Sequence, residues 1–203
     1  PNDNIGITLF AGETFTQCPL TVDHAVLLDM IHNIKCGLIE DGTAVGMGIA
    51  NAVTRLKDSK AKSKVIILLT DGTNNKGDIS PLTAAEIAKS FGIRVYTIGV
   101  GTNGMAPYPY PVGNTVQYVN MPVEIDEKTL TQIAGTTDGN YFRATSNSKL
   151  KEVYEEIDKL EKTKLNVKEY SKRDEEYQWF ALAAFLCVLL EVLLRNSILK
   201  KIP

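Results

Sequence analysis

The chain has 203 residues and a formal net charge of −2, from 22 basic and 24 acidic side chains. This length suits one sizeable domain with a shorter additional segment, and the balanced charge gives no electrostatic reason to expect nucleic-acid binding. Three cysteines, Cys18, Cys36 and Cys187, are too widely spaced for a zinc site. Cys18 and Cys36 would form a disulfide only if the fold brought them together.

The N-terminal part of the chain predicts two strands and a helix. Residues 5–10 alternate as a strand does, and residues 14–20 form a second short extended segment that Pro19 is expected to end. Asp23 is placed to cap the N-terminus of the following helix. The expected packing face of that helix carries Val26, Leu27, Met30, Ile31 and Ile34.

The loop CGLIEDGT leads into a second predicted helix, over residues 44–56. Its apolar residues are spaced to pack against a sheet. Gly46 and Gly48 weaken the helix, which indicates that another backbone or a ligand comes close at these positions.

The middle of the chain predicts a strand–helix–strand unit. The run VIILL at residues 65–69 and the run IRVYTIGV at residues 93–100 are continuous apolar strands. Between them a helix is expected to start at Ser80–Pro81, an N-cap and N1 pair, and to end at Gly92. Buried strands joined by a helix indicate parallel pairing, with helices covering both faces of an α/β fold.

The pattern changes after Gly104. Residues 105–121 contain several prolines and a Gly113–Asn114 turn flanked by tyrosine and valine, which predicts a hairpin insert. Asp126 then caps a short helix, GNYFRA forms a last strand, and SKLKEVYEEIDKLEKTK forms a charged amphipathic helix. Residues 161–176 are predicted to be a polar linker.

Residues 177–196 predict a transmembrane helix. Twenty residues of α-helix span about 30 Å, enough to cross the hydrocarbon of a bilayer. Tyr177 and Trp179 lie at one end, whereas Arg195, Lys200 and Lys201 lie at the other. The basic residues place the tail, 197–203, in the cytoplasm and the preceding domain outside it. The alternative is a buried core helix, although such helices are seldom apolar on every face.

Two polar loops suggest a cation site. Asp71 follows the strand at 65–69, and Asp41, Gly42 and Thr43 directly precede a helix. Ligands of open parallel α/β sheets bind beyond the carboxyl ends of the strands, and oxygen ligands from two loops suit Mg²⁺, with water in the remaining positions. The alternative is that Asp71 stabilises its own turn and Thr43 caps its helix, which these two loops alone favour.

Taken together, four segments resemble a von Willebrand factor A (VWA) domain over roughly residues 1–160. They are NIGITLFAGETFTQCPLT, DGTAVGMGIANAV, VIILLTDGTNN and IRVYTIGVGT. With the apolar C-terminal segment and the tail ILKKIP, the chain is most similar to the Bat family, bacterial aerotolerance-associated membrane proteins. The resemblance implies a doubly wound, mostly parallel, Rossmann-like sheet and a metal-ion-dependent adhesion site (MIDAS).

In that site, the resemblance makes Thr43 a direct metal ligand and Asp71 an acidic member that often acts through water. The remaining ligands of the family belong to a D-x-S-x-S motif at the end of the first strand, which does not occur in these 203 residues. We therefore expect an N-terminally truncated domain that lacks its first strand, folds poorly alone and leaves its Mg²⁺ site largely unoccupied. Mg²⁺, or another divalent cation, is expected in the intact protein.

The motifs argue against dinucleotide binding and against nucleophilic catalysis. Gly99-Val-Gly101-Thr-Asn-Gly104 fits the dinucleotide-binding pattern, but that pattern must open a helix, and the prolines that follow Gly104 prevent one. His24 and His32 both lie on the first predicted helix, and the sequence contains no G-x-S-x-G motif and no Walker lysine. No catalytic residue and no nucleotide cofactor are therefore predicted.

The resemblance, together with the apolar C-terminal segment, implies a non-enzymatic interaction module on the extracytoplasmic (periplasmic) side of a bacterial inner membrane. Its metal would bind an acidic side chain of a protein partner, expected to be another membrane-complex subunit, and the C-terminal helix would contact lipid. Tyr108, Tyr110 and Tyr118 of the insert could add partner contacts. The alternatives are a structural subunit with a degenerate metal site and a metal-dependent hydrolase that uses Asp71.

Overall fold

The computed structural model describes residues 3–35, 37, 39–101, 104–112, 115–123, 125–170 and 177–197. Of these, the side chains of residues 106–111, 121–123, 164–170, 177–179, 193 and 195–197 are left undescribed. The chain divides into two compact units, residues 1–161 and residues 162–203. Cys36 and the predicted turn residues Gly113 and Asn114 lie outside the described part, so the pairing of Cys18 with Cys36 is not tested and the turn stays a prediction.

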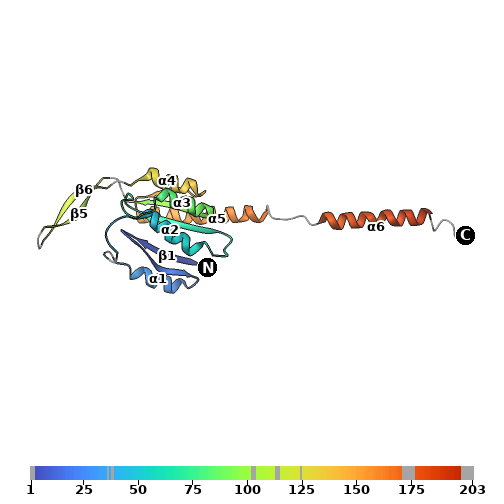
Figure 1. The fold of residues 1–203 in the computed structure, drawn as a ribbon, viewed down its shortest axis with the longest axis horizontal. Helices are drawn as coiled ribbons and strands as arrows, with labels where there is room; N and C mark the ends of the chain where they lie inside the picture. The colour runs from blue at the N-terminus through green and yellow to red at the C-terminus, as the bar shows by residue number, and fades with distance from the viewer. Residues whose placement is uncertain are drawn as a thin grey trace. The chain divides into compact units, whose positions relative to one another are not determined.

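A three-stranded parallel sheet forms the centre of the first unit (Figure 1). Its order is β3 (Lys64–Thr70), β4 (Ile93–Val100) and β7 (Tyr141–Ala144). Leu68 is paired with Thr97, and Ile98 with Phe142, so the three carboxyl ends lie at one edge. The predicted α/β class with a parallel sheet is therefore confirmed.

Helices cover both faces of this sheet, as continuous apolar strands require. On one face, Ile66 and Leu68 pack with α2 (Val45–Leu56), α3 (Pro81–Ser90) and α4 (Glu127–Thr136). On the other face, Tyr96 and Ile98 pack with Val153 and Ile157 of α5 (Asn147–Tyr170). The predicted caps are confirmed: Ser80 Oγ accepts from Thr83 N at 3.1 Å and Asp126 Oδ1 accepts from Thr129 N at 3.0 Å.

A polar cluster fastens α5 to the amino-terminal end of the sheet. The Glu161 carboxylate accepts hydrogen bonds from Arg94 Nε at 2.9 Å, from the Tyr96 hydroxyl at 2.6 Å and from Ser63 Oγ at 2.8 Å. Arg94 also forms an ion pair with Glu161, and both side chains are only 15% exposed. Because every oxygen of the carboxylate is bonded, this charge is buried together with its partners.

The first two strands form a separate antiparallel hairpin, β1 (Ile5–Phe10) with β2 (Thr14–Thr21). β2 continues past Pro19, so the prediction that Pro19 ends this strand is wrong. In a two-stranded hairpin both strands are edge strands, where proline is tolerated. In the described residues this hairpin and the β3–β4–β7 sheet are not hydrogen-bonded to each other. The described strands therefore do not form one continuous doubly wound sheet. Among them, β3 lies at an edge of the parallel sheet although its residues are almost all aliphatic.

Helix α2 connects the hairpin to the parallel sheet. The Phe10 ring lies against Gly48, where a Cβ atom would approach the ring to 3.0 Å. On the polar side, Asn51 Nδ2 donates to Thr14 Oγ1 at 3.1 Å and Arg55 Nε donates to Thr16 Oγ1 at 3.1 Å. The expectation that a glycine of this helix admits a close neighbour is confirmed.

Helix α1 (His24–His32) begins at its predicted N-cap, because Asp23 Oδ1 accepts from Ala25 N at 3.0 Å. Its predicted packing face is wrong, however. Leu27 is buried, but Val26 and Ile31 are 44% and 43% exposed. Among the described elements, the short helix lies mainly against the β1–β2 hairpin, which is too narrow to cover a full apolar stripe.

The predicted insert is a long hairpin of β5 (Gly104–Val112) and β6 (Thr115–Val123), which projects away from the helices of the first unit (Figure 1). Gly104 thus begins a strand and not the helix that a dinucleotide site needs. The predicted linker, 161–176, is helical as far as Tyr170, where α5 ends.

Helix α6 (Tyr177–Ser197) occupies the predicted membrane segment. Its described large apolar side chains are exposed, among them Phe180, Phe185 and Leu190. Within the part of the chain that the structure describes, no helix reaches the combined length and hydropathy needed to cross a membrane.

Candidate functional site

The two predicted site residues lie on neighbouring loops at the carboxyl end of the parallel sheet. Thr43 directly precedes the N-cap of α2, and Asp71 directly follows β3. A Cβ atom placed on Gly72 would lie 3.4 Å from Thr43 Oγ1, which is ordinary van der Waals contact. The fold therefore brings the Thr43 hydroxyl beside the backbone that carries Asp71.

Asn75 connects these two loops. Its side-chain Oδ1 accepts a hydrogen bond from Thr43 N at 2.8 Å, and its own backbone N–H donates to the Thr43 carbonyl at 3.0 Å. Lys76 N also donates to that carbonyl, at 3.4 Å. Asn75 is not among the predicted site residues, because one asparagine in the polar run GTNNKGD gives no signal of the distant backbone that it binds.

The β1–β2 turn supports the loop before α2 from the other side. Ala44 N donates to the Ala11 carbonyl at 2.7 Å, and Gly12 N donates to the Glu40 carbonyl at 2.7 Å. Gly42 has a φ of +146°, and a Cβ atom there would lie 3.0 Å from Gly12 Cα. The site is thus assembled from three loops, and a glycine is needed where two of them touch.

The structure argues against the purely structural roles considered for both residues. The N-cap of α2 is Ala44, which forms no side-chain cap, so Thr43 does not cap this helix. The turn after β3 is stabilised by Thr70, whose Oγ1 accepts from Gly72 N at 3.3 Å. Among the described residues, neither the exposed Asp71 carboxylate nor the half-buried Thr43 hydroxyl has a hydrogen-bond partner.

These two side chains fit part of a hard-cation site. A hydroxyl and a carboxylate are ligands that Mg²⁺ accepts, directly or through water. In the described residues, however, no group of three or more His, Cys, Asp or Glu side chains is placed to hold a metal ion. Thr43 and Asp71 alone supply too few oxygen atoms for tight binding.

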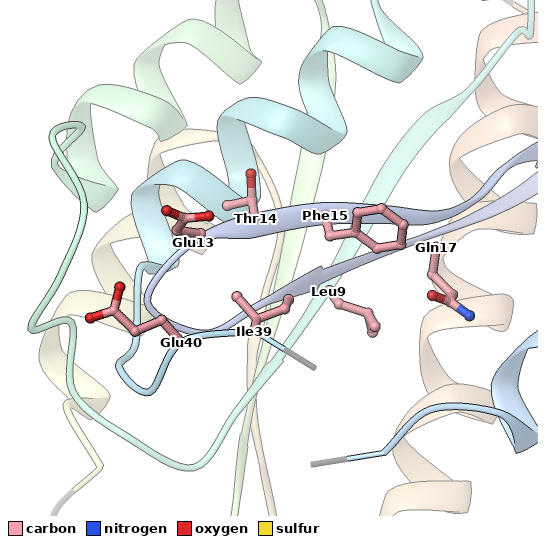
Figure 2. Close-up of a pocket in the computed structure, with 7 residues that line it drawn as sticks. All are labelled: Leu9, Glu13, Thr14, Phe15, Gln17, Ile39 and Glu40. Atoms are coloured by element: carbon pink, nitrogen blue, oxygen red, sulfur yellow. The ribbon is translucent and has the colours of Figure 1, made fainter. Parts of the chain in front are cut away.

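A pocket of about 380 Å³ lies elsewhere, on the β1–β2 hairpin (Figure 2). Figure 2 shows Leu9, Phe15 and Ile39 in its apolar part, with Glu13 and Glu40 at one end. Phe15 is 55% exposed. The pocket contains neither Thr43 nor Asp71.

The order of the elements and the two loops at the sheet edge agree with the comparison to known families. The sequence matches the profile of the von Willebrand factor type A domain over residues 1–156. The chain belongs to this family. Its VWA domain therefore occupies almost the whole first unit, and the resemblance inferred from four sequence segments is confirmed.

Solved structures agree with this assignment. BatB from Bacteroides thetaiotaomicron is 34% identical, with a TM-score of 0.68 over 80% of this chain and 81% of that one. An aerotolerance-related membrane protein from Bacteroides fragilis is 30% identical, with a TM-score of 0.65 over 78% and 81%. The similarity of this VWA domain to Bat proteins is thus confirmed.

A more distant solved structure contains a metal. Proximal thread matrix protein 1 from the mussel byssus, with zinc in its MIDAS motif, is 26% identical, with a TM-score of 0.59 over 77% of this chain and 34% of that one. An uncharacterised protein of Borreliella burgdorferi is 25% identical over 202 residues, 99% of this chain. The chain spans 59% of the length of that relative.

Proposed function

We propose that this VWA domain is a membrane-anchored, non-enzymatic module that binds a protein partner through a divalent cation. The observation that carries the proposal is the pairing of Thr43 and Asp71. Both are adjacent at the carboxyl end of the sheet, and neither side chain is used by another described residue. Polar groups held in place without an internal partner are available to a ligand.

In the proposed site the Thr43 hydroxyl binds the cation directly and the Asp71 carboxylate binds it through water. The cation supplies a positive charge with an open coordination position, which an acidic side chain of the partner completes. Asn75 holds the Thr43 backbone, so the hydroxyl is positioned before the cation arrives. Mg²⁺ suits these oxygen ligands, and the zinc in the mussel protein supports a divalent ion at this place in the fold.

The remaining ligands are proposed to come from a D-x-S-x-S segment outside these 203 residues, on a strand that pairs with the open edge of β3. Three observations support this. The chain contains no such motif, β3 is an edge strand despite its aliphatic sequence, and the chain spans only part of its relatives' length. A continuous apolar strand is usually paired on both sides.

We also propose that α6 anchors the module in a bacterial inner membrane, with the VWA domain on the periplasmic side. The helix has 21 residues, so its length is about 31 Å at 1.5 Å per residue. Its exposed apolar side chains would contact lipid, and Lys200 and Lys201 would stay cytoplasmic. The description of one neighbour as an aerotolerance-related membrane protein supports association with a membrane and a role related to aerotolerance.

A second candidate function follows from the presence of only two proposed ligands in this chain. If the parent protein also lacks the remaining ligands, the chain is a structural subunit of a membrane complex with a degenerate metal site. A metal-dependent hydrolase would need a general base in addition to Asp71.

The test is partner capture by the full-length protein that contains this chain, in Mg²⁺ and in EDTA. Asp71→Ala and Thr43→Ala should each abolish capture in Mg²⁺ while the circular dichroism spectrum stays unchanged. Equal capture in EDTA and Mg²⁺ contradicts a metal bridge and supports the structural subunit. Turnover of an ester or phosphoester substrate that needs Mg²⁺ and Asp71 would instead support a hydrolase.

A further inference from the structure

The β5–β6 hairpin has prolines at alternate positions. Pro107, Pro109 and Pro111 of β5 face Asn120, Tyr118 and Val116 of β6, and Pro122 of β6 faces Met105. Proline has no N–H group, so it cannot belong to a pair that exchanges two hydrogen bonds. Because hydrogen-bonded and non-hydrogen-bonded pairs alternate in an antiparallel ladder, all these prolines occupy the non-hydrogen-bonded pairs.

It follows that the hairpin is held together by the residues between the prolines. Tyr108 with Val119, Tyr110 with Gln117, and Val112 with Thr115 are the hydrogen-bonded pairs. Residues of the non-hydrogen-bonded pairs point their backbone C=O groups away from the hairpin, and so do the N–H groups of those that are not proline. The two outer edges therefore differ in the hydrogen bonds that they offer.

The outer edge of β5 is blocked. Where β5 passes Pro107, Pro109 and Pro111, it presents carbonyl groups but no N–H donors, so another strand cannot form a regular ladder with it. The outer edge of β6 is open. Val116, Tyr118 and Asn120 each present one N–H and one C=O outward, and no described strand pairs with them.

Natural proteins usually protect such an edge with charged side chains, above all lysine. Residues 104–123 contain no Asp, Glu, Lys, Arg or His. Val116 is 59% exposed and Tyr118 is 72% exposed. A two-stranded hairpin that is exposed in this way is marginally stable by itself, and further strands would stabilise it. Absence of charge and enrichment in tyrosine are also typical of the centre of an interface.

We propose that two copies of this chain associate through their β6 edges and form a four-stranded antiparallel sheet. The two-fold axis passes beside Tyr118, which pairs with Tyr118 of the second copy, while Val116 pairs with Asn120. Each of these pairs exchanges both of its backbone hydrogen bonds, since every member carries a donor and an acceptor. The blocked β5 edges lie on the outside and stop the sheet at four strands.

The β6 edge is complementary to itself, so we infer that its partner is a second copy of this chain. Antiparallel pairing about a two-fold axis brings the same segment against itself, and Val116–Asn120 contains no charge that would repel its copy. Attachment of both copies to one membrane would raise their effective concentration, so a modest edge contact would suffice. This association uses neither Thr43 nor Asp71 and is independent of the proposed metal bridge.

The first test removes one outward donor from the full-length protein that contains this chain, in detergent micelles. Tyr118→Pro deletes the central N–H of the β6 edge, but it leaves the internal ladder intact because position 118 faces Pro109 in a non-hydrogen-bonded pair. Sedimentation should show dimerisation weakened by about 10-fold or more, equivalent to about 1.4 kcal/mol. Tyr118→Thr keeps the N–H and is the matched control. Equal weakening by both substitutions would contradict pairing through the backbone.

The second test measures register by oxidative cross-linking, with Cys18, Cys36 and Cys187 replaced by serine. Tyr118→Cys should cross-link to itself, because a hydrogen-bonded antiparallel pair has a Cα–Cα distance of about 5.5 Å, inside the range for disulfides. Val116→Cys should not, since two copies of residue 116 would be about 14 Å apart. A mixture of Val116→Cys and Asn120→Cys chains should cross-link again.

The outcomes separate this proposal from the other one. Dimerisation and cross-linking should be the same in Mg²⁺ and in EDTA, and Asp71→Ala should leave both unchanged. A chain that stays monomeric up to about 100 µM, a concentration at which weak transient interfaces are still populated, contradicts the β6–β6 pair. So does a cross-linking pattern in which residues 116, 118 and 120 react equally.

Discussion

Asn75 binds Thr43 through both its side chain and its backbone. Asn75 Oδ1 accepts a hydrogen bond from Thr43 N at 2.8 Å, while Asn75 N donates to the Thr43 carbonyl at 3.0 Å. A residue of the loop after β3 therefore positions the residue before α2. The two halves of the candidate metal site are coupled by this pair and not only by proximity.

The first prediction tests this coupling. Asn75→Ala removes the side-chain acceptor, so Thr43 should be held less firmly and divalent-cation affinity of the full-length protein should fall by about 10-fold, as is typical for outer-shell partners of metal ligands. Asn75→Asp keeps an acceptor at the same place and should retain most of the affinity. Mn²⁺ titration monitored by electron paramagnetic resonance measures both. If Asn75→Asp weakens binding as much as Asn75→Ala, the side-chain hydrogen bond is not what positions Thr43.

The second prediction concerns stability at the site. Because Asp71 is exposed and its carboxylate has no partner among the described residues, Asp71→Ala should change the free energy of unfolding by no more than about 0.5 kcal/mol. Urea denaturation of the wild type and the variant measures the difference. A loss above about 2 kcal/mol would show that Asp71 stabilises the fold, and a change in metal or partner binding could then not be assigned to a lost ligand.

The third prediction uses two glycines in helices. A Cβ atom on Gly46 would lie 2.0 Å from the Ile79 carbonyl oxygen, and backbone cannot rotate away as a side chain can. Gly46→Ala should therefore destabilise the domain by about 3 kcal/mol, at the upper end for overpacking. It should also displace the loop that ends at Ile79 and begins at Asp71.

Gly135 of α4 is the matched control for that substitution. A Cβ atom there meets nothing within 4 Å. Gly135→Ala should stabilise the domain by about 0.5–1 kcal/mol, because alanine has the higher helix propensity. Thermal unfolding of the two variants should therefore shift in opposite directions, and a shift in the same direction would contradict the packing of α2 against Ile79.

The fourth prediction follows from the Glu161 cluster. Burial raises the pKa of Glu161, but the hydrogen bonds from Arg94, Tyr96 and Ser63 outweigh it and leave this pKa below its ordinary value. A depressed carboxyl pKa stabilises the fold at pH values above the unfolded pKa of about 4.3. That stabilisation is lost as the pH falls through the lower folded value.

The wild type should therefore lose stability on acidification more steeply than Glu161→Gln, measured by urea denaturation between pH 6 and pH 3. Burial, together with the hydrogen bond to Glu161, raises the pKa of Tyr96 far above its ordinary value. That contribution is present below about pH 10 and is lost at higher pH. At neutral pH, Glu161→Gln should cost about 3 kcal/mol, because it leaves Arg94 buried without its countercharge. Parallel pH profiles for the wild type and the variant would contradict the assignment.

Much of the fold could be predicted because local signals and packing agree. Continuous aliphatic runs correctly predicted β3 and β4, and the N-cap residues Ser80 and Asp126 correctly predicted the starts of two helices. The predicted packing face of α1 was wrong because periodicity identifies an apolar face but not the element that would cover it. Pro19 does not end β2, because the free edge of a hairpin strand does not need an N–H group from this residue.

The positions of the two proposed ligands could be predicted from the sequence, but the residues that support them could not. Asp71 and Thr43 stand at the ends of recognisable elements, so their meeting at the sheet edge follows from topology. Asn75, Gly12 and the Ala11 carbonyl bind across long sequence separations through only one or two hydrogen bonds each, which leave no local pattern. The blocked edge of β5 was visible as a proline repeat, but its meaning depended on the pairing register.

The central claim is that Thr43 and Asp71 hold a divalent cation together with ligands outside this chain. The most direct measurement is Mn²⁺ titration of the full-length protein, of its Asp71→Ala variant and of the 203-residue chain alone. We expect one saturable site in the full-length protein and binding weaker by about 10- to 100-fold in the variant. The isolated chain should bind only weakly. Equal affinity for the full-length protein and the Asp71→Ala variant would contradict the claim.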